Sequence, residues 1–553
     1  MEKKTLIKTC VDCKKEFEIN SGDLVLYEKV GLELSHQCFK CMMKQFCAFW
    51  VFGKFRKGVS DLSGESIITV LSQNVRYPVY KSHEWWGDGW DPMIYGQDYD
   101  SSQSFFNQLK ELQEKVPRPH QIGKNNTNCD WCDDVWNSKN AYLSRAFTDC
   151  ENISYGYRLV NCKDSFDLVY NINVQNSYDC LACHDSFNLH FSENCKDCID
   201  SYFLFDCRNC QNCFMSWNLR NKQYCIRNQQ YSKEEYEEEL KKIKLDSYKE
   251  IEKLKEEIQN ILKDEAVHRE NFNLKTTNSV GNYLTNCDKC VNVFSWENSQ
   301  NCRNQIRGLN TKDCINQLGC WEEEMSGNNA GVFGGYQIKH SVWSDARYSE
   351  YLDNCIECEY CFGCIGLRKK KYCILNKQYE KEEYEKLKDK IISDMKKRGE
   401  YGKFLPYNMS MYEYNLSIGM IYFPEVTKDE IVDKGGYWSE EDLSQTDGIS
   451  SLELPDSILD TPKEITTKAL ICPKSYYRFN IADSELQFHK RKGLALPRIH
   501  FDLRTLRKAR KTAVLKSYPY KCSYCKKDIN AYYPPEWGYK KIACEECYKQ
   551  NIA

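Results

Sequence analysis

The chain has 553 residues, enough for several domains with buried cores, so its 32 cysteines are not needed as staples for a small fold. No apolar run reaches the roughly 18 residues of a membrane span, and the start MEKKTLIKTC lacks the apolar core of a secretion signal. We therefore expect a cytoplasmic protein without membrane contact, whose closely spaced cysteines are metal ligands or buried thiols rather than disulfides. The net charge of −3 hides an asymmetry, because residues 468–553 carry 19 Lys and Arg against 7 Asp and Glu.

Residues 1–92 are predicted to form an N-terminal zinc-ribbon-like module. Zinc binds four ligands tetrahedrally, and each C-x-x-C turn places two thiolates side by side, so two such pairs complete its coordination shell. A complete set has no open position for water or substrate, which predicts a structural ion. Four buried free thiols are the alternative. The predicted ligands are Cys10, Cys13, Cys38 and Cys41.

Residues 93–119 are expected to be a linker with a short helix, and 120–231 a first cysteine-rich repeat. Its units combine Asn-Cys or Asp-Cys with Ser-Tyr or Ser-Phe, as in NCKDSF from Asn161. The aromatic residues of successive units, such as Phe166 and Tyr178, follow one another too closely for helical hairpins, so we expect short strands separated by polar turns. Units of this length, stacked in register, predict a β-solenoid with cysteines inside and asparagines in the turns.

A second cysteine-rich repeat is expected over 271–379. Residues 207–237 and 355–385 share 18 of 31 positions without a gap at an offset of 148, so the chain contains an internal duplication. The cysteine triplets from Cys207 and Cys355 are similar to an iron–sulfur pattern, but they lack its longer last gap and following proline. Packing thiols inside the solenoid are the preferred interpretation. A second class of metal site and a cluster are the alternatives.

Each repeat is followed by a predicted helix. Ser232-x-x-Glu235 matches a capping box and begins a long amphipathic helix over 232–270. Its counterpart over 380–398 runs from Lys381 to about Lys397. Residues 399–467 contain several prolines and Gly435-Gly436, and are expected to form an extended acidic connector.

Residues 468–553 are predicted to form a C-terminal basic module related to the N-terminal one. An offset of 462 aligns Gly31 with Gly493 and Cys10 with Cys472. Each copy keeps one complete cysteine set. In the N-terminal copy the second set is replaced by Ser60, Ser63, Ser82 and Trp85. In the C-terminal copy three members of the first set are replaced by Ser475, His500 and Leu503. About two Zn²⁺ per chain are expected. The C-terminal ligands are Cys522, Cys525, Cys544 and Cys547.

Basic residues precede the C-terminal cysteine set. Tyr518, Tyr520 and Tyr524 follow these basic residues, just before and within the first C-x-x-C pair. Cations that neutralise phosphates, with aromatic rings for stacking, are typical of a nucleic-acid surface. Docking of the same residues on the acidic body is the alternative. The candidate nucleic-acid-binding residues are Lys490, Arg491, Lys492, Arg498, Arg504, Arg507, Lys508, Arg510 and Lys511.

The order of zinc knuckles, WWGDGWDPMIYGQDYD, NCKDC-like repeats, LRNKQYCI with QYSKEEYE, and a final C-x-x-C module resembles a family of cysteine-rich zinc-ribbon proteins from small-genome, candidate-phylum bacteria. The resemblance covers nearly the whole chain. It implies zinc at the matched knuckles and a cytoplasmic bacterial protein, but no activity. A CoA-transferase label sometimes attached to such proteins has no supporting residues here.

The expected fold is therefore mainly β with helices: duplicated solenoid-like repeats, each followed by a helix, between zinc-ribbon-like ends. The leading functional hypothesis is a non-enzymatic zinc protein that binds RNA, DNA or a ribonucleoprotein through residues 468–553. The alternative is a protein–protein interaction scaffold built on the repeats. No phosphate loop, dinucleotide fingerprint or serine elbow is found, so neither catalytic residues nor a small-molecule substrate are predicted.

Overall fold

A computed structural model of the chain describes residues 5–72, 75–440 and 447–552. The chain divides into two units, and each combines one terminal module with the repeat that is distant from it in sequence. Unit 1 contains residues 1–121 and 271–439, and unit 2 contains residues 122–270 and 440–553. The terminal modules are thus parts of larger units. The division at 270/271 coincides with the expected start of the second repeat, whereas the expected connector is divided at 439/440.

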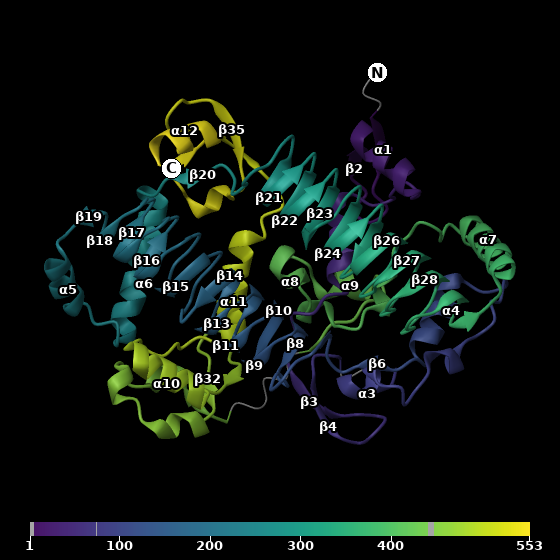
Figure 1. Ribbon diagram of the computed structural model, residues 1–553, viewed down its shortest axis with the longest axis horizontal. Coiled ribbons are helices and arrows are strands. Elements are labelled where there is room, and N and C mark those ends of the chain that lie inside the picture. Colours follow the sequence, from purple (N-terminus) through teal and green to yellow (C-terminus); the bar gives the residue numbers. More distant parts are fainter. Residues whose placement is uncertain (1–4, 73–74, 441–446, 553) are drawn as a thin grey trace. The chain divides into compact units, whose positions relative to one another are not determined.

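The first repeat, in unit 2, winds in short coils of constant length. Except for the last two, which form an antiparallel pair, its strands pair in parallel, each residue with the one twelve positions further on, as in the pairing of Cys132 with Ser144 and of Cys213 with Cys225. Figure 1 shows these strands as successive arrows. We call residues 122–230 the first coil stack. Its strands are β7 (Gly123–Lys124), β8 (Cys132–Trp136), β9 (Lys139–Tyr142), β10 (Ser144–Thr148), β11 (Glu151–Ser154), β12 (Tyr157–Val160), β13 (Lys163–Phe166), β14 (Val169–Gln175), β15 (His184–His190), β16 (Ile199–Phe205), β17 (Gln211–Trp217), β18 (Gln223–Ile226) and β19 (Gln229–Gln230).

Every coil turns a corner at every third residue. Corner residues such as Asn140, Asn152 and Asp164 have φ of 54°, 54° and 48°, in the left-handed region that Asn and Asp tolerate better than other side chains. The next residue in each case, such as Ala141 or Ile153, is buried inside the coil. Each of the recurring Asn-Cys, Asp-Cys and Asp-Ser pairs therefore consists of a corner residue followed by an interior residue.

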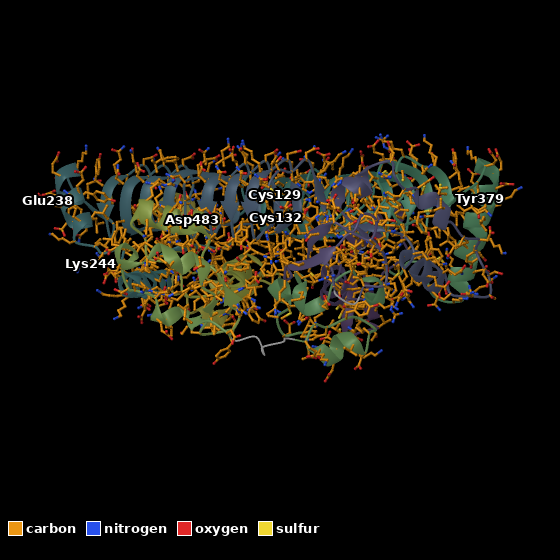
Figure 2. All side chains as sticks on the ribbon, turned by 90° about the horizontal axis from the view of Figure 1, so that it is seen from below. Cys129, Cys132, Glu238, Lys244, Tyr379 and Asp483 are labelled. Atoms are coloured by element: carbon orange, nitrogen blue, oxygen red, sulfur yellow. The ribbon has the colours of Figure 1, made fainter. Side chains whose placement is uncertain are left out.

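The cysteines of the first coil stack fill this interior. The Cys180 thiol donates to the Leu189 carbonyl at 3.1 Å, so the sulfur also satisfies a backbone acceptor. Cys129 and Cys132, marked in Figure 2, are both buried. All 32 cysteines of the chain are free thiols in the structure.

The second repeat, in unit 1, follows the same rule less regularly. Most pairings keep the shift of the first stack, as in Arg303 with Ile315, but Gly335 pairs with Ala346, one position short of it. We call residues 271–378 the second coil stack. Its strands are β21 (Val280–Asp288), β22 (Val291–Gln300), β23 (Arg303–Leu309), β24 (Ile315–Glu324), β25 (Gly327–Ala330), β26 (Phe333–Lys339), β27 (Ala346–Glu350), β28 (Cys358–Phe362), β29 (Lys371–Ile374) and β30 (Lys377–Gln378).

The helix after the first coil stack differs from the prediction. The capping box at Ser232 and Glu235 is present, but the helix ends at Lys241, so α5 (Lys233–Lys241) and α6 (Tyr248–Asp264) replace one long helix. Ser247 caps α6 by accepting a hydrogen bond from the Glu250 amide. The counterpart in unit 1, α7 (Lys381–Lys397), has the predicted bounds.

The terminal modules are built alike, as the offset of 462 predicts. In the first half of each, an antiparallel strand pair is followed by two helices: β1 (Leu6–Thr9), β2 (Glu16–Ile19), α1 (Ser21–Val30) and α2 (Phe39–Cys47), against β32 (Leu470–Ile471), β33 (Arg478–Phe479), α10 (Asp483–Lys492) and α11 (Phe501–Thr512). The second halves contain β3 (Arg56–Val59), β4 (Ser66–Thr69), β5 (Val79–Tyr80) and α3 (Ser82–Trp86), against β34 (Tyr518–Lys521), β35 (Asp528–Ala531), β36 (Ile542–Ala543) and α12 (Glu545–Asn551).

Glycine ends the first helix of both modules. Gly31 and Gly493 follow α1 and α10 with φ of 70° and 61°, a conformation that favours glycine. In each unit a short strand just before a repeat pairs in parallel with the module: β6 (Arg118–Pro119) with β5, and β20 (His268–Arg269) with β36.

The expected extended connector is partly folded. In unit 1, residues 399–439 contain α8 (Gly419–Tyr422) and α9 (Lys428–Val432), and bury Leu405, Met409 and Ile418. Residues 93–119 contain α4 (Phe105–Gln113), where a short helix is expected. None of the helices in the described part of the chain combines the length and apolarity that a membrane crossing requires.

Candidate metal centres and the basic surface

The N-terminal cysteine set lies where a tight turn meets the start of a helix. Cys10 and Cys13 lie on the turn after β1, closed by a hydrogen bond from the Lys14 amide to the Cys10 carbonyl at 3.0 Å, with Lys14 at φ 60°. Cys38 is the residue before α2, and Cys41 lies in the first turn of that helix. The set thus draws its ligands from two elements that the rest of unit 1 positions.

The C-terminal set repeats this geometry in the second half of its module. The Lys526 amide donates to the Cys522 carbonyl at 3.0 Å, with Lys526 at φ 62°, and Cys544 precedes α12. Cys525 lies on the same turn as Cys522, and Cys547 in the first turn of α12.

Both sets fit a tetrahedral ion. In each, the four sulfur atoms lie within 4.8 Å of one another, and the Sγ atoms of Cys13 and Cys38, and of Cys525 and Cys544, are 3.8 Å apart. A tetrahedral ion with metal–sulfur bonds of about 2.3 Å requires sulfur separations of roughly 3.8 Å. Within the described ranges, these two sets are the only groups of three or more His, Cys, Asp or Glu side chains whose possible ligand atoms lie this close together. The two sets could hold two metal ions per chain.

Hydrogen bonds favour the thiolate at Cys38 and Cys522, while hydrogen bonds between the thiols raise the pKa of Cys41 and Cys547. The Cys38 amide donates to Cys10 Sγ at 3.3 Å, and the Cys544 amide to Cys522 Sγ at 3.4 Å. Hydrogen bonding from Cys41 lowers the pKa of Cys38 to about 5. Burial opposes ionisation of Cys522, but backbone N–H donors outweigh it and lower its pKa to about 6. Four thiols and no further ligand describe a closed site that stabilises structure.

The other half of each module keeps the turn without the ligands. In unit 1, the Gly64 amide donates to the Ser60 carbonyl at 2.8 Å, and the Ser60 hydroxyl donates to Glu84 at 2.5 Å, where a thiolate set would hold an ion. In unit 2, the Tyr476 amide donates to the Cys472 carbonyl at 2.9 Å, and the His500 amide donates to Cys472 Sγ at 3.4 Å. The turn is therefore retained independently of metal binding.

Three of the candidate nucleic-acid residues line one face of α11, which packs on the first coil stack. Arg504 forms an ion pair with Asp167 at 3.1 Å and Lys508 with Asp179 at 2.6 Å, and Lys511 pairs with Glu193. Figure 1 shows α11 beside β14, and the two elements are in contact.

Helix and coil spacings match along this contact. From residue 504 to 511 an α-helix rises about 10.5 Å, and two coils advance by roughly 9.6 Å. Each successive basic residue therefore meets an acidic residue about one coil further on. Burial opposes ionisation, but Lys508, Lys255 and Arg507 hold the pKa of Asp179 well below its usual range.

The remaining candidates are divided between the interior and the surface. The buried Arg498 donates to the carbonyls of Ser451 at 2.8 Å and Pro455 at 2.6 Å. Lys492, partly buried, donates to Asn188 at 2.5 Å. Four candidates are exposed: Lys490, Arg491, Arg507 and Arg510. The nine residues do not form one exposed surface, because five of them are used in contacts within unit 2.

The acidic partners were not among the sequence candidates. Asp167 and Asp179 are corner residues one coil apart, with φ of 57° and 54°. A sequence pattern could have indicated them: acidic residues one coil length apart in the repeat, together with basic residues at helical spacing in another segment.

Comparisons with known proteins add no family. No protein-family model matches the chain, and no curated protein matches it. Among solved structures, one likeness is to a "putative acetyltransferase" from Desulfovibrio desulfuricans, with 11% identity and a TM-score of 0.10 over 44% of this chain. The match spans 63% of that protein, less than two thirds of its length, and at this score it supports neither a fold nor an activity.

Proposed function

We propose that the protein is a non-enzymatic, zinc-stabilised scaffold whose two repeats are β-solenoids that present surfaces to a protein partner. The observation that carries this proposal is that Arg504, Lys508 and Lys511 form ion pairs with the first coil stack. These basic residues are therefore used within unit 2 rather than presented to a nucleic acid. The exposed corners of the coil stacks, such as Asn140, Asn152 and Asp164, are then the surfaces that a partner could contact.

Zinc is the ion best suited to both cysteine sets. Four thiolates with tetrahedral spacing select zinc or an iron–sulfur centre among common metals, and two C-x-x-C pairs are typical of zinc ribbons. In each module one ion would link a turn to a helix end, so that metal binding stabilises the module against unfolding.

Nucleic-acid binding has less support than the scaffold role. Phosphate contacts need exposed cations, and only Lys490, Arg491, Arg507 and Arg510 among the nine candidates are exposed. The experiment that separates the two hypotheses is fluorescence anisotropy with labelled polyuridylate at 50 and 200 mM salt. A scaffold shows no salt-dependent binding. Binding whose salt slope falls by about one in Lys490→Ala would reverse the preference.

Metal analysis of matched variants tests the zinc assignment. The wild-type chain should contain about two zinc ions, and Cys41→Ser or Cys525→Ser about one. Cys472→Ser is the control, because Cys472 occupies a turn without a complete set and its loss should leave the zinc content unchanged. Zinc loss in Cys472→Ser, or iron instead of zinc in the wild type, would contradict the assignment.

A further inference from the structure

Unit 2 contains a groove of about 520 Å³ between the first coil stack and α10, whose first residue, Asp483, is marked in Figure 2. One wall is a row of coil corners, and the other is the exposed side of the helix. On the helix side the lining side chains are Ser484, Gln487 and Arg491, which are all exposed. Neither the metal sites nor the contact of α11 uses these residues.

The coil wall is a ladder of side-chain amides. Asn128 donates to Asn140 at 3.0 Å, Asn140 to Asn152 at 3.0 Å, and Asn152 to Asp164 at 2.7 Å, and all four residues are exposed. Each amide has two N–H donors and an oxygen with two acceptor positions, so a ladder bond on each side leaves a donor and an acceptor for a ligand. The result is a polar edge that offers both kinds of hydrogen bond at every coil.

Aromatic rings line the groove beneath this edge. Trp131 and Tyr142 are half-buried, with ring centroids 6.3 Å apart, and Phe166 packs against Phe488 of α10 with centroids 4.6 Å apart. Rings held in this way provide apolar faces without moving on binding.

The charges of the lining argue against a polyanion. Asp130 and Asp164 face a single cation, Arg491, whereas a phosphate backbone needs several. The spacing argues against an extended peptide, which advances about 3.3 Å per residue, while the amides repeat at the coil spacing of roughly 4.8 Å. The coil spacing is close to the length that one hexopyranose adds to an extended chain, and sugars combine apolar ring faces with hydroxyl donors and acceptors.

We infer that this groove binds an extended, neutral oligosaccharide, with sugar faces against the aromatic rings and hydroxyl groups on the amide ladder and α10. The groove differs from the corresponding part of unit 1, where Asn301 also donates to Asp313 at 2.6 Å, but Asp313 is buried and forms an ion pair with Lys29 of α1 at 2.9 Å. It is therefore not a by-product of the duplication. This inference goes beyond the scaffold role, which it neither needs nor excludes.

Calorimetric titration of the zinc-loaded full chain tests the inference, with the hexasaccharides of β-1,4-glucose, β-1,4-N-acetylglucosamine and α-1,4-glucose as probes. At least one should bind, and Trp131→Ala should weaken it about tenfold, the loss expected for one well-packed aromatic contact. Gln487→Ala and Arg491→Ala change exposed positions of α10, so they should fold normally and weaken binding several-fold.

Phe187→Ala is the matched control, because Phe187 is an exposed aromatic residue of the first coil stack outside the groove. It should leave the affinity unchanged. The inference fails if no hexasaccharide binds at millimolar concentration, or if binding is the same in all three groove variants. It also fails if polyuridylate binds in a Trp131-dependent manner while the neutral sugars do not.

Discussion

Replacing Arg504 by methionine should destabilise unit 2 more than any surface substitution on the same helix. The Asp167 side chain is 1% exposed and that of Arg504 is 10% exposed, so the pair is shielded from water. Neither carboxylate oxygen of Asp167 has a hydrogen-bond partner within the described part of the chain, and burial raises the pKa of this carboxyl despite Arg504. Removing one partner of such a pair costs about 3–5 kcal/mol, because the other charge stays buried without compensation.

The assay is urea unfolding followed by circular dichroism, in a cycle with Asp167→Asn and the double variant. Asparagine keeps the left-handed corner, where Asp167 has φ 57°, so that substitution removes only the charge. We expect Arg504→Met to lose about 3–5 kcal/mol and the double variant to recover at least roughly 1 kcal/mol through coupling.

Arg507→Met is the control on the exposed side of α11; Arg507 acts on Asp179 only after Lys508 and Lys255, so its loss should change stability by less than about 1 kcal/mol. Equal stabilities of Arg504→Met and Arg507→Met would refute the packing of this helix face on the coils. The basic residues would then be available to an external partner.

Two further outcomes follow from burial and from backbone geometry. Burial raises the pKa of Glu485 from 4.5 to about 7. The folded state therefore holds a proton that the unfolded state has lost, and stability should fall by about 3 kcal/mol as pH rises from 4.5 to 7. Glu485→Gln should flatten this part of a stability profile, and an unchanged slope would contradict the burial argument. Asn161→Ala should cost about 1–2 kcal/mol, because alanine at φ 51° is strained and loses the 2.8 Å bond to Asn173; thermal unfolding should show a smaller loss for Asn161→Gly.

Sequence patterns predicted the features that depend on few neighbouring residues. The capping box at Ser232 and the two cysteine sets follow from local backbone chemistry, whereas the helices α1 and α10, which end at Gly31 and Gly493, were not predicted. The break between α5 and α6 also had a local signal, Ser247-x-x-Glu250, but the apolar stripe that continues across it concealed the end of the helix.

Two features could not be predicted because they depend on long-range registration. The uneven spacing of the aromatic residues concealed a constant coil length, since the ring can lie on any of the four sides of a coil, mostly at the residue before a corner, as Phe166 and Tyr178 do. The basic residues of α11 were predicted as a group, but their partners lie far away in sequence, and only the folded coils bring Asp167, Asp179 and Glu193 into one row.

One contact between terminal module and coil stack recurs in both units. In unit 1, Asp23 of α1 accepts a hydrogen bond from Arg303 of the second coil stack at 3.2 Å. In unit 2, Glu485 of α10 accepts one from Tyr155 of the first coil stack at 2.6 Å. Residues 23 and 485 differ by 462, and residues 155 and 303 differ by 148. Tyr155 is a corner residue, whereas Arg303 directly precedes the corner Asn304, so module and repeat dock within one residue of equivalent coil positions in both units.

The element that the two units share is therefore the docking, not the metal. The chemistry of the shared contact changes from an ion pair to a hydrogen bond with a neutral hydroxyl, while its position on the coil changes by only one residue. Each module keeps four cysteines in one half and only the bare turn in the other. One cysteine set that could hold a metal ion is retained in each module, and the half without such a set keeps its fold in both units.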